Sequence, residues 1–211
     1  MFHKRLRLAR ALVGPSEYAG PLMNYLKHSS DGQGPYPLCA LSDLMIDFKR
    51  YVKSAFNVSQ DLRKAGELRV SFVTRSKAAK NQRNLHRQLL NEREVMTATQ
   101  KTITDLMKNV TVICKTVDFA KLTYRDQLLA AGATDIFIGM HGAGMVNALW
   151  LPTNARVWEI FPKHKRRFGY LQICRYTGCR YQEYRGGEDK ENNGKMLDID
   201  EWITFVKQTL K

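Results

Sequence analysis

The residues best suited to bind a ligand form the glycine-rich stretch HGAGMVN at positions 141–147. It connects a short apolar segment to a helical pattern, and glycines at such a turn let the backbone come close to a ligand. The helix that follows offers unpaired N–H groups and the positive end of its dipole to phosphate. We therefore predict that Gly142, Ala143 and Gly144 bind a phosphorylated substrate. A tight turn without a ligand stays an alternative, because the stretch lacks the third glycine or alanine of the dinucleotide fingerprint.

Two polar side chains stand in this stretch. His141 could donate a hydrogen bond to phosphate or orient a substrate, and we take it as the catalytic candidate; the alternative is a histidine that bonds to its own loop. Asn147 is a substrate-binding candidate that could equally fix the loop or lie on the helix surface.

A carboxylate follows in the next apolar segment, VWEIF at 157–161. At the carboxyl end of a strand, Glu159 could accept hydrogen bonds from ribose hydroxyls. A charged side chain among apolar neighbours needs a partner when it is buried. A structural ion pair is therefore the alternative to ribose binding.

Two arginines could hold a diphosphate. Arg75 directly follows the apolar, β-branched segment LRVSFVT, which predicts a strand at 68–74, and its guanidinium could bind phosphates bidentately. Arg87 precedes a predicted helix and is the second candidate. The basic run KHKRR at 163–167 could line the same crevice, or it could be a solvated loop.

Other chemistries find no support in the motifs. The sequence has no Ser–His–Asp elbow, HExxH motif or Walker A loop. Its four cysteines form no CxxC pair, which argues against a zinc site but permits disulfides. We predict neither a metal nor a cofactor.

These residues need a scaffold that brings them together. Short apolar segments alternate with amphipathic ones, which predicts a parallel sheet covered by helices on both faces, an α/β, Rossmann-like three-layer domain. The predicted strands are 68–74, 110–114, 135–139, 156–161 and 179–184. The predicted helices are 42–56, 91–107, 123–131, 143–151, 168–177 and 198–210. In this fold Arg75, His141 and Glu159 face one crevice at the carboxyl ends of the strands.

Three further segments carry expectations of their own. Leu44, Phe48, Tyr51, Val52 and Ala55 recur at helical spacing, which predicts that the first helix buries this face. The basic segment 77–88 is expected to be solvated, and 186–194 to be a polar loop.

Length and charge set the outer limits. The chain of 211 residues has room for one domain and a tail, which we place at 42–211 and 1–41. No apolar run reaches the ~18–20 residues of a membrane span, and the basic start lacks the apolar stretch of a signal peptide. The net charge of +14 predicts an anionic partner: nucleic acid, a phosphorylated small molecule or a membrane surface.

Several segments together resemble glycosyltransferase family 61, most closely its eukaryotic branch. The strongest likeness lies in DIFIGMHGAGMVNALWLP at 135–152 and VWEIFP at 157–162. The segments VTRS at 73–76, RQLLNERE at 87–94 and YRDQL at 124–128 support it. The segment at 87–94 matches the family pattern only after a gap, because extra basic residues precede it in this chain.

The resemblance covers roughly residues 42–184 and implies the C-terminal lobe of a two-lobed GT-B transferase, with the N-terminal lobe absent. It implies a UDP-sugar donor such as UDP-GlcNAc or UDP-xylose, inversion at the anomeric carbon, and a glycoprotein or glycan hydroxyl as acceptor. The HGAG turn and Arg75 would hold the diphosphate and Glu159 the ribose, without an evident need for a metal. Family members usually work in the lumen of the endoplasmic reticulum or Golgi. With neither leader nor anchor evident, we expect a piece of a longer transferase.

Two other functions stay open. The charge, the basic run after Arg75 and three tyrosines interleaved with arginines at 175–185 would suit a nonspecific nucleic-acid-binding module. No DNA- or RNA-binding motif accompanies them, so we expect no specific nucleic-acid partner. An inactive nucleotide-binding remnant is the third possibility.

Overall fold

The computed structural model describes residues 41–75, 87–163, 169–191 and 194–210. Its centre is a five-stranded sheet with the order β2-β1-β3-β4-β5, in which every neighbouring pair is parallel. The strands are β1 (Glu67–Val73), β2 (Thr111–Val117), β3 (Ile136–Met140), β4 (Arg156–Ile160) and β5 (Arg180–Tyr184). The predicted α/β class is confirmed, and β2 runs three residues beyond its predicted end.

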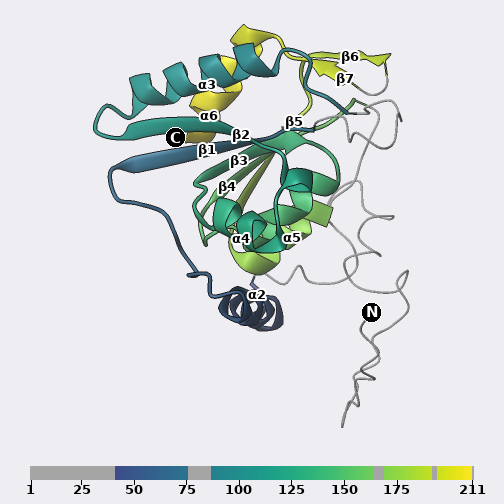
Figure 1. Ribbon diagram of the computed structural model, residues 1–211. Coiled ribbons are helices and arrows are strands. Elements are labelled where there is room, and N and C mark those ends of the chain that lie inside the picture. The colour runs from purple at the N-terminus through teal and green to yellow at the C-terminus, as the bar shows by residue number, and fades with distance from the viewer. Residues whose placement is uncertain (1–40, 76–86, 164–168, 192–193, 211) are drawn as a thin grey trace.

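Helices cover both faces of the sheet, so the domain has three layers (Figure 1). On one face lie α3 (Glu92–Leu106) and α6 (Ile199–Leu210). On the other lie α4 (Tyr124–Gly132), the 3₁₀ helix η2 (Ala143–Trp150) and α5 (Gly169–Thr177), with the short 3₁₀ turn η1 (Phe119–Lys121) before α4. A separate apolar core fills each interface between sheet and helices.

The strand order reverses between β1 and β3, because the chain leaves β1 to form β2 on one side and then returns to form β3 on the other. In open parallel sheets, ligands bind outside the carboxyl ends of the strands at such a switch point. Arg75 follows β1 and the HGAG turn follows β3, so the topology brings the two predicted binding segments to this position.

The prediction of a polar loop at 186–194 is wrong. Residues Glu188–Lys190 (β6) and Gly194–Met196 (β7) form an antiparallel ribbon. Lys195 of β7 is fully buried, and its ammonium donates to the carbonyl of Phe161 at 2.7 Å and to a carboxylate oxygen of Asp189 at 3.0 Å. Hydrogen bonds rather than apolar burial hold this ribbon, which is why hydropathy did not reveal it.

The first helix, α2 (Asp43–Ala55), forms as predicted, but the prediction of its buried face is wrong. Leu44 and Tyr51 are 79% and 74% exposed, whereas Lys49 and Lys53 are buried. Figure 1 shows α2 outside the layer of α4 and α5. Carbonyl groups that no helix or strand pairs lie beside α2, and such groups need hydrogen-bond donors when they are buried.

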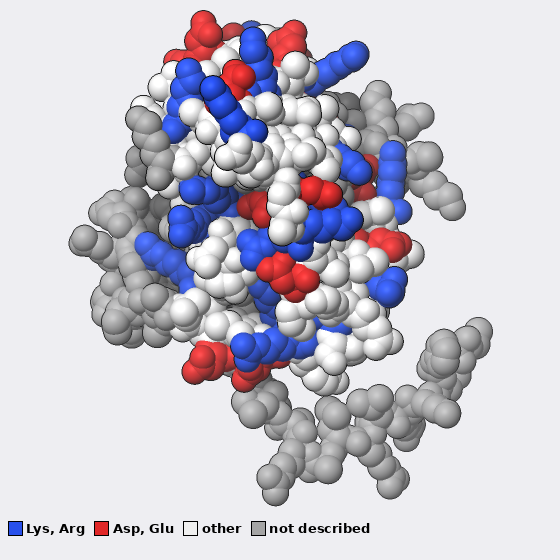
Figure 2. Space-filling view, turned by 90° about the vertical axis from the view of Figure 1, so that its left-hand side faces the viewer, with Lys and Arg blue, Asp and Glu red and all other residues white. Residues whose placement is uncertain are grey.

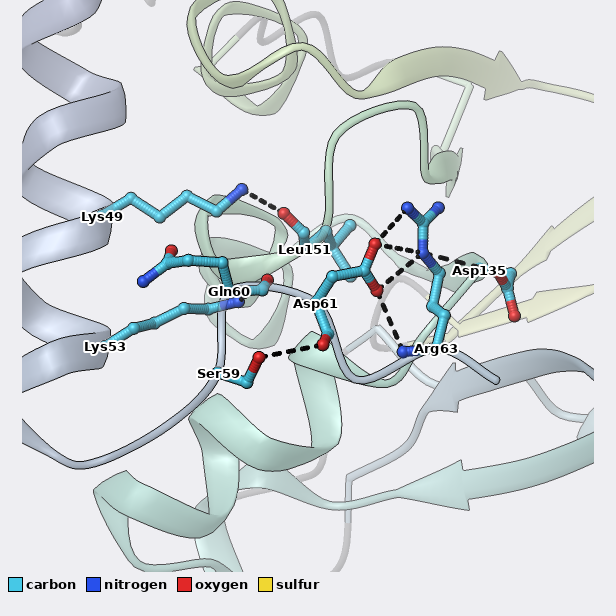
Figure 3. A network of polar contacts seen from close by, with 8 residues as sticks. All are labelled: Lys49, Lys53, Ser59, Gln60, Asp61, Arg63, Asp135 and Leu151. Atoms are coloured by element: carbon cyan, nitrogen blue, oxygen red, sulfur yellow. Dashed lines mark hydrogen bonds and ion pairs between the residues drawn. The ribbon is translucent and has the colours of Figure 1, made fainter. Parts of the chain in front are cut away.

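Figure 3 shows how the two lysines satisfy that need. The ammonium of Lys49 donates to the carbonyl oxygen of Leu151, the residue that follows η2, and Lys53 donates to the carbonyl oxygen of Gln60 at 2.7 Å. The long aliphatic stems are buried while each charged end reaches an acceptor. An apolar face at helical spacing therefore identified the helix but not the side that it buries.

Most of the net positive charge, +10 of +14, lies outside the described residues. The undescribed residues hold 12 of the 34 Lys and Arg but only two of the 20 Asp and Glu, so the described ones carry 22 basic and 18 acidic side chains. On the face in Figure 2, basic side chains are interleaved with acidic ones. The basic segment predicted to be solvated and the run after Lys163 lie almost wholly outside the described residues, as does all but the last residue of the predicted tail.

Two further features bear on where the chain could work. Cys174 and Cys179 form a disulfide between the end of α5 and the start of β5, whereas the half-buried Cys114 is a free thiol. Within the described ranges, no helix is both long and apolar enough to cross a bilayer.

Candidate functional site

A cavity of about 160 Å³ opens beside the switch point between β1 and β3. It is lined by Val73, Thr74, Arg75, Arg87, Gln88, Leu89, Glu92, Met140 and Gly144. Three of the residues predicted from the sequence, Arg75, Arg87 and Gly144, therefore meet in one cavity although they belong to three separate segments. The fold supplies this proximity, because β1 and β3 are neighbours in the sheet.

Arg75 also lies directly against the HGAG turn. A Cβ atom added to Gly142 would overlap Nη2 of Arg75. The guanidinium can therefore lie where it does only because residue 142 has no side chain. Gly142 has an extended backbone with a φ of 163°, so space rather than an unusual conformation requires glycine here. A Cβ atom on Gly144 would meet Cγ1 of Val73 at 2.7 Å, so this second glycine lets the turn pack on β1.

The cavity concentrates positive charge. Burial lowers the pKa of Arg75, and the nearby charge of Arg87 lowers this pKa further, while Tyr170 opposes the change. Like charges held close together are unfavourable unless an anion accompanies them. Arg87 has a φ of 63°, a conformation that non-glycine residues rarely adopt and that is enriched at functional sites.

His141 and Glu159 contact each other. Nδ1 of His141 lies 2.5 Å from Oε1 of Glu159, and the hydroxyl of Tyr181 donates to Oε2 of the same carboxylate at 2.6 Å. Glu159 is completely buried and His141 is 4% exposed. Glu159 therefore has a structural partner, as the alternative expects, although its contact with His141 is an ion pair only when the imidazole is protonated. Its predicted contact with ribose stays a prediction.

Burial raises the pKa of the Glu159 carboxyl, and the hydrogen bonds from His141 and Tyr181 oppose that rise. A carboxylate with a donor on each oxygen can stay ionised in an apolar environment. Burial also raises the pKa of Tyr181, so its hydroxyl remains a donor at neutral pH.

The other two predicted residues of the turn lie in η2. Asn147 is buried, and its Nδ2 donates to the carbonyl oxygen of Gly144 at 3.2 Å, so its observed role is to fix the loop. Ala143 is exposed at the start of η2. Contacts of either residue with a substrate stay predictions.

The sequence did not single out Thr74 or Glu92, and it singled out Tyr181 only as one of the tyrosines that would suit nucleic-acid binding. Burial raises the pKa of the Glu92 carboxyl in the cavity wall, and a hydrogen bond with Thr74 opposes the rise. Thr74 directly precedes Arg75 at the carboxyl end of the same strand. Residues at that end are expected to face a ligand, so Thr74 could also have been predicted. Tyr181 lies two residues inside its strand and gave no such signal.

The family model described as Glycosyltransferase 61 matches residues 30–158. The chain belongs to glycosyltransferase family 61. This match covers β1, β3, both cavity arginines and the whole HGAG turn, and it confirms the family that the motifs resemble.

Several curated proteins are similar to most of this chain. The EGF domain-specific O-linked N-acetylglucosamine transferase of Canis lupus familiaris is 33% identical over 187 residues, which cover 81% of this chain and 33% of that protein. The protein of the same name from Rattus norvegicus is 35% identical with the same coverage. That from Drosophila melanogaster is 30% identical and covers 66% of this chain. The chain thus spans about a third of the length of these relatives.

Proposed function

We propose that this chain is the donor-binding part of an inverting glycosyltransferase that uses a UDP-sugar. The observation that carries the proposal is the meeting of Arg75, Arg87 and Gly144 in one cavity at the switch point of the sheet. Guanidinium groups bind phosphate oxygens bidentately, and Gly144 lets the HGAG turn and its backbone lie against β1 beside both arginines. A nucleoside diphosphate matches both features.

The same groups would serve the reaction. In an inverting transfer, the bond from the anomeric carbon to the β-phosphate oxygen breaks while the acceptor hydroxyl oxygen bonds to that carbon from the opposite face. The electron pair of the broken bond remains on the diphosphate, and the hydroxyl proton passes to a base. Arg75 and Arg87 would stabilise the developing charge on the diphosphate, so the proposal requires no metal ion.

We propose N-acetylglucosamine as the sugar and a hydroxyl of an EGF domain as the acceptor, since the similar curated transferases carry these words in their names. Xylose is the alternative sugar. A GT-B architecture, with the domain as its C-terminal lobe, fits the parallel sheet and the ligand position. The Cys174–Cys179 disulfide supports an oxidising compartment such as the secretory lumen.

Calorimetric titration of the 211-residue chain with UDP tests the proposal. We expect UDP to bind, and Arg75→Ala and Arg87→Ala each to weaken binding by ~1.5–3 kcal/mol, because each removes a charge-assisted hydrogen bond. Arg93→Ala, at an exposed position of α3, is the matched control and should leave the affinity unchanged. An affinity that does not depend on either cavity arginine would contradict the proposal.

A nucleic-acid-binding module predicts the opposite pattern. Binding to phosphates along a strand would weaken steeply with salt and would respond to Arg93→Ala as much as to Arg75→Ala. A gel-shift series at rising salt separates the two.

A further inference from the structure

The buried carboxylate of Glu159 occupies a specific place in the sheet. In the register of β3 and β4, Glu159 lies opposite Gly139, and in that of β4 and β5 it lies opposite Glu183. Side chains two residues apart point to the same face of a sheet. His141 and Tyr181 each stand two residues from these partners, so both reach Glu159 diagonally from the two neighbouring strands.

The hydrogen bonds fix the state of the imidazole ring. With the Glu159 carboxylate ionised, both of its oxygens can only accept, and the 2.5 Å contact then requires a proton on Nδ1 of His141. The Tyr181 hydroxyl donates to the other oxygen and so keeps Glu159 from turning away. Among the described residues, all side-chain hydrogen bonds of His141 are made by Nδ1, which leaves Nε2 to face other partners.

Neighbouring rings hold the orientation of the imidazole. Phe161 stacks on His141 with 4.8 Å between ring centroids and 17° between planes, and Tyr170 of α5 lies at 5.8 Å on a tilt. The hydroxyl of Tyr170 donates to the carbonyl oxygen of Gly142 at 2.7 Å, so it fixes the turn as well as the ring.

His141 does not itself line the cavity, but two of its near neighbours in the chain do. Met140 precedes His141 and Gly144 follows three residues later, and both line the cavity. Gly142 packs against Arg75. A ligand anion held by Arg75 would thus sit beside the imidazole.

We infer that Glu159, supported by Tyr181, is a positioning residue that keeps a proton on Nδ1 of His141 and presents Nε2 to the diphosphate of the bound donor. This inference rests on the proposed function. The diphosphate attracts a proton to Nε2, which then donates a hydrogen bond to a phosphate oxygen, while the buried carboxylate balances the charge of the ring. Glu159 thus acts on the ligand through His141, although it is buried out of direct reach.

Nitrogen NMR on the 211-residue chain labelled with ¹⁵N-histidine tests the positioning directly. The shifts of the two ring nitrogens distinguish the tautomers, and a His141→Ala spectrum assigns the signal. We expect the neutral His141 ring of the wild-type chain to carry its proton on Nδ1. A ring with its proton on Nε2 would overturn the inference without any need for a variant.

Substitutions at Glu159 separate positioning from packing. Glu159→Leu removes the acceptor and the negative charge together, so we expect the neutral His141 ring to shift to the Nε2–H tautomer. Because the ring that donates to the diphosphate then lacks both its acceptor and the carboxylate that balances its charge, we expect the UDP affinity to fall about tenfold. Glu159→Gln keeps an oxygen that accepts from Nδ1, so the tautomer and most of the affinity should be retained. Glu67→Gln, at the start of β1 and so at the opposite end of the sheet, is the matched control and should change neither.

The outcomes are distinguishable from those of the proposed function. If Glu159→Leu keeps both the Nδ1–H tautomer and the affinity, the inference is wrong. If the tautomers behave as expected but the wild-type chain does not bind UDP, the proposed function and the phosphate contact of Nε2 fall together, whereas the positioning of His141 by Glu159 stands.

Discussion

Both ends of the parallel sheet contain cationic side chains, but the two ends treat them differently. At the end where α4 and α5 finish, Lys49 and Lys53 of α2 are buried. Each donates to a backbone carbonyl, that of Leu151 or of Gln60. At the carboxyl ends of the strands, Arg75 and Arg87 line a cavity and repel each other. The buried lysines serve packing, whereas the two arginines that share a cavity wall with Glu92 are placed where an anionic ligand could reach them.

The largest effect that we expect concerns the buried lysines and pH. Burial lowers the pKa of Lys49 and of Lys53 from 10.5 to about 8. Between these values the unfolded chain binds more protons than the folded chain, so the free energy of unfolding rises with pH in this window. From pH 8 to pH 9.5 the gain is up to about 1.5 kcal/mol per lysine.

Urea unfolding of the wild type, of Lys49→Met and of Lys53→Met at both pH values measures this gain. Each variant should lose its share of the pH dependence, because methionine does not titrate. Arg50→Met, at an exposed neighbouring position of α2, should keep the full dependence. Equal slopes in all four proteins would mean that the lysines are not desolvated as the packing of α2 requires.

The second prediction concerns buried charge at the carboxyl edge. Tyr181→Phe removes the donor to Oε2 of Glu159 and leaves this buried oxygen without its partner. We expect the free energy of unfolding to fall by about 1–2 kcal/mol. Tyr51→Phe on the exposed face of α2 is the control and should change it little. An unchanged stability of Tyr181→Phe would show that the carboxylate does not depend on this donor.

The third prediction tests the contact between the glycine turn and the arginine. Gly142→Ala introduces a Cβ atom where Nη2 of Arg75 now lies, so the guanidinium must move. Because this is the end of a flexible side chain, we expect little loss of stability but roughly tenfold weaker UDP binding, about 1.4 kcal/mol. Val146→Ala, at an exposed position of η2, is the control for calorimetry. A Gly142→Ala chain that binds UDP normally would remove Arg75 from the site or the turn from its vicinity.

The smallest effect is expected beside α2. Asp61→Asn breaks the ion pair with Arg63, in which both side chains are partly exposed. Such pairs contribute less than about 1 kcal/mol in solution. The charge of Asp61 also raises the pKa of Lys53, so the variant should lower that pKa slightly further. A loss above about 2 kcal/mol on urea unfolding would place Asp61 among the groups that hold α2 to the domain.

The sequence predicted elements more successfully than contacts. Apolar strands alternating with helices were sufficient for the five parallel strands and the helices that cover them, because burial on both faces leaves a continuous apolar signal. The ribbon of β6 and β7 was not predicted, because backbone pairing and a buried lysine hold it together and neither gives an apolar pattern in the sequence. The face of α2 was predicted wrongly, because long lysine stems can be buried as readily as aromatic rings.

The candidate site divides in the same way. Arg75 and the HGAG turn could be predicted, since strand ends and glycine-rich turns have a fixed place in a parallel sheet. The role of Glu159 could not be predicted, because it depends on which residues stand two positions from its partners on β3 and β5. Register is a property of the assembled sheet rather than of any one segment.

By itself the sequence determined the α/β class, the family and the segments that approach a ligand, because each of these depends on local pattern and composition. Only the tertiary structure decided that Arg87 joins Arg75 in one cavity and that the carboxylate of Glu159 bonds to His141. It also decided which face of α2 is buried. The physical reason is that a side chain's partner, and the desolvation it undergoes, depend on neighbours that are distant in the chain.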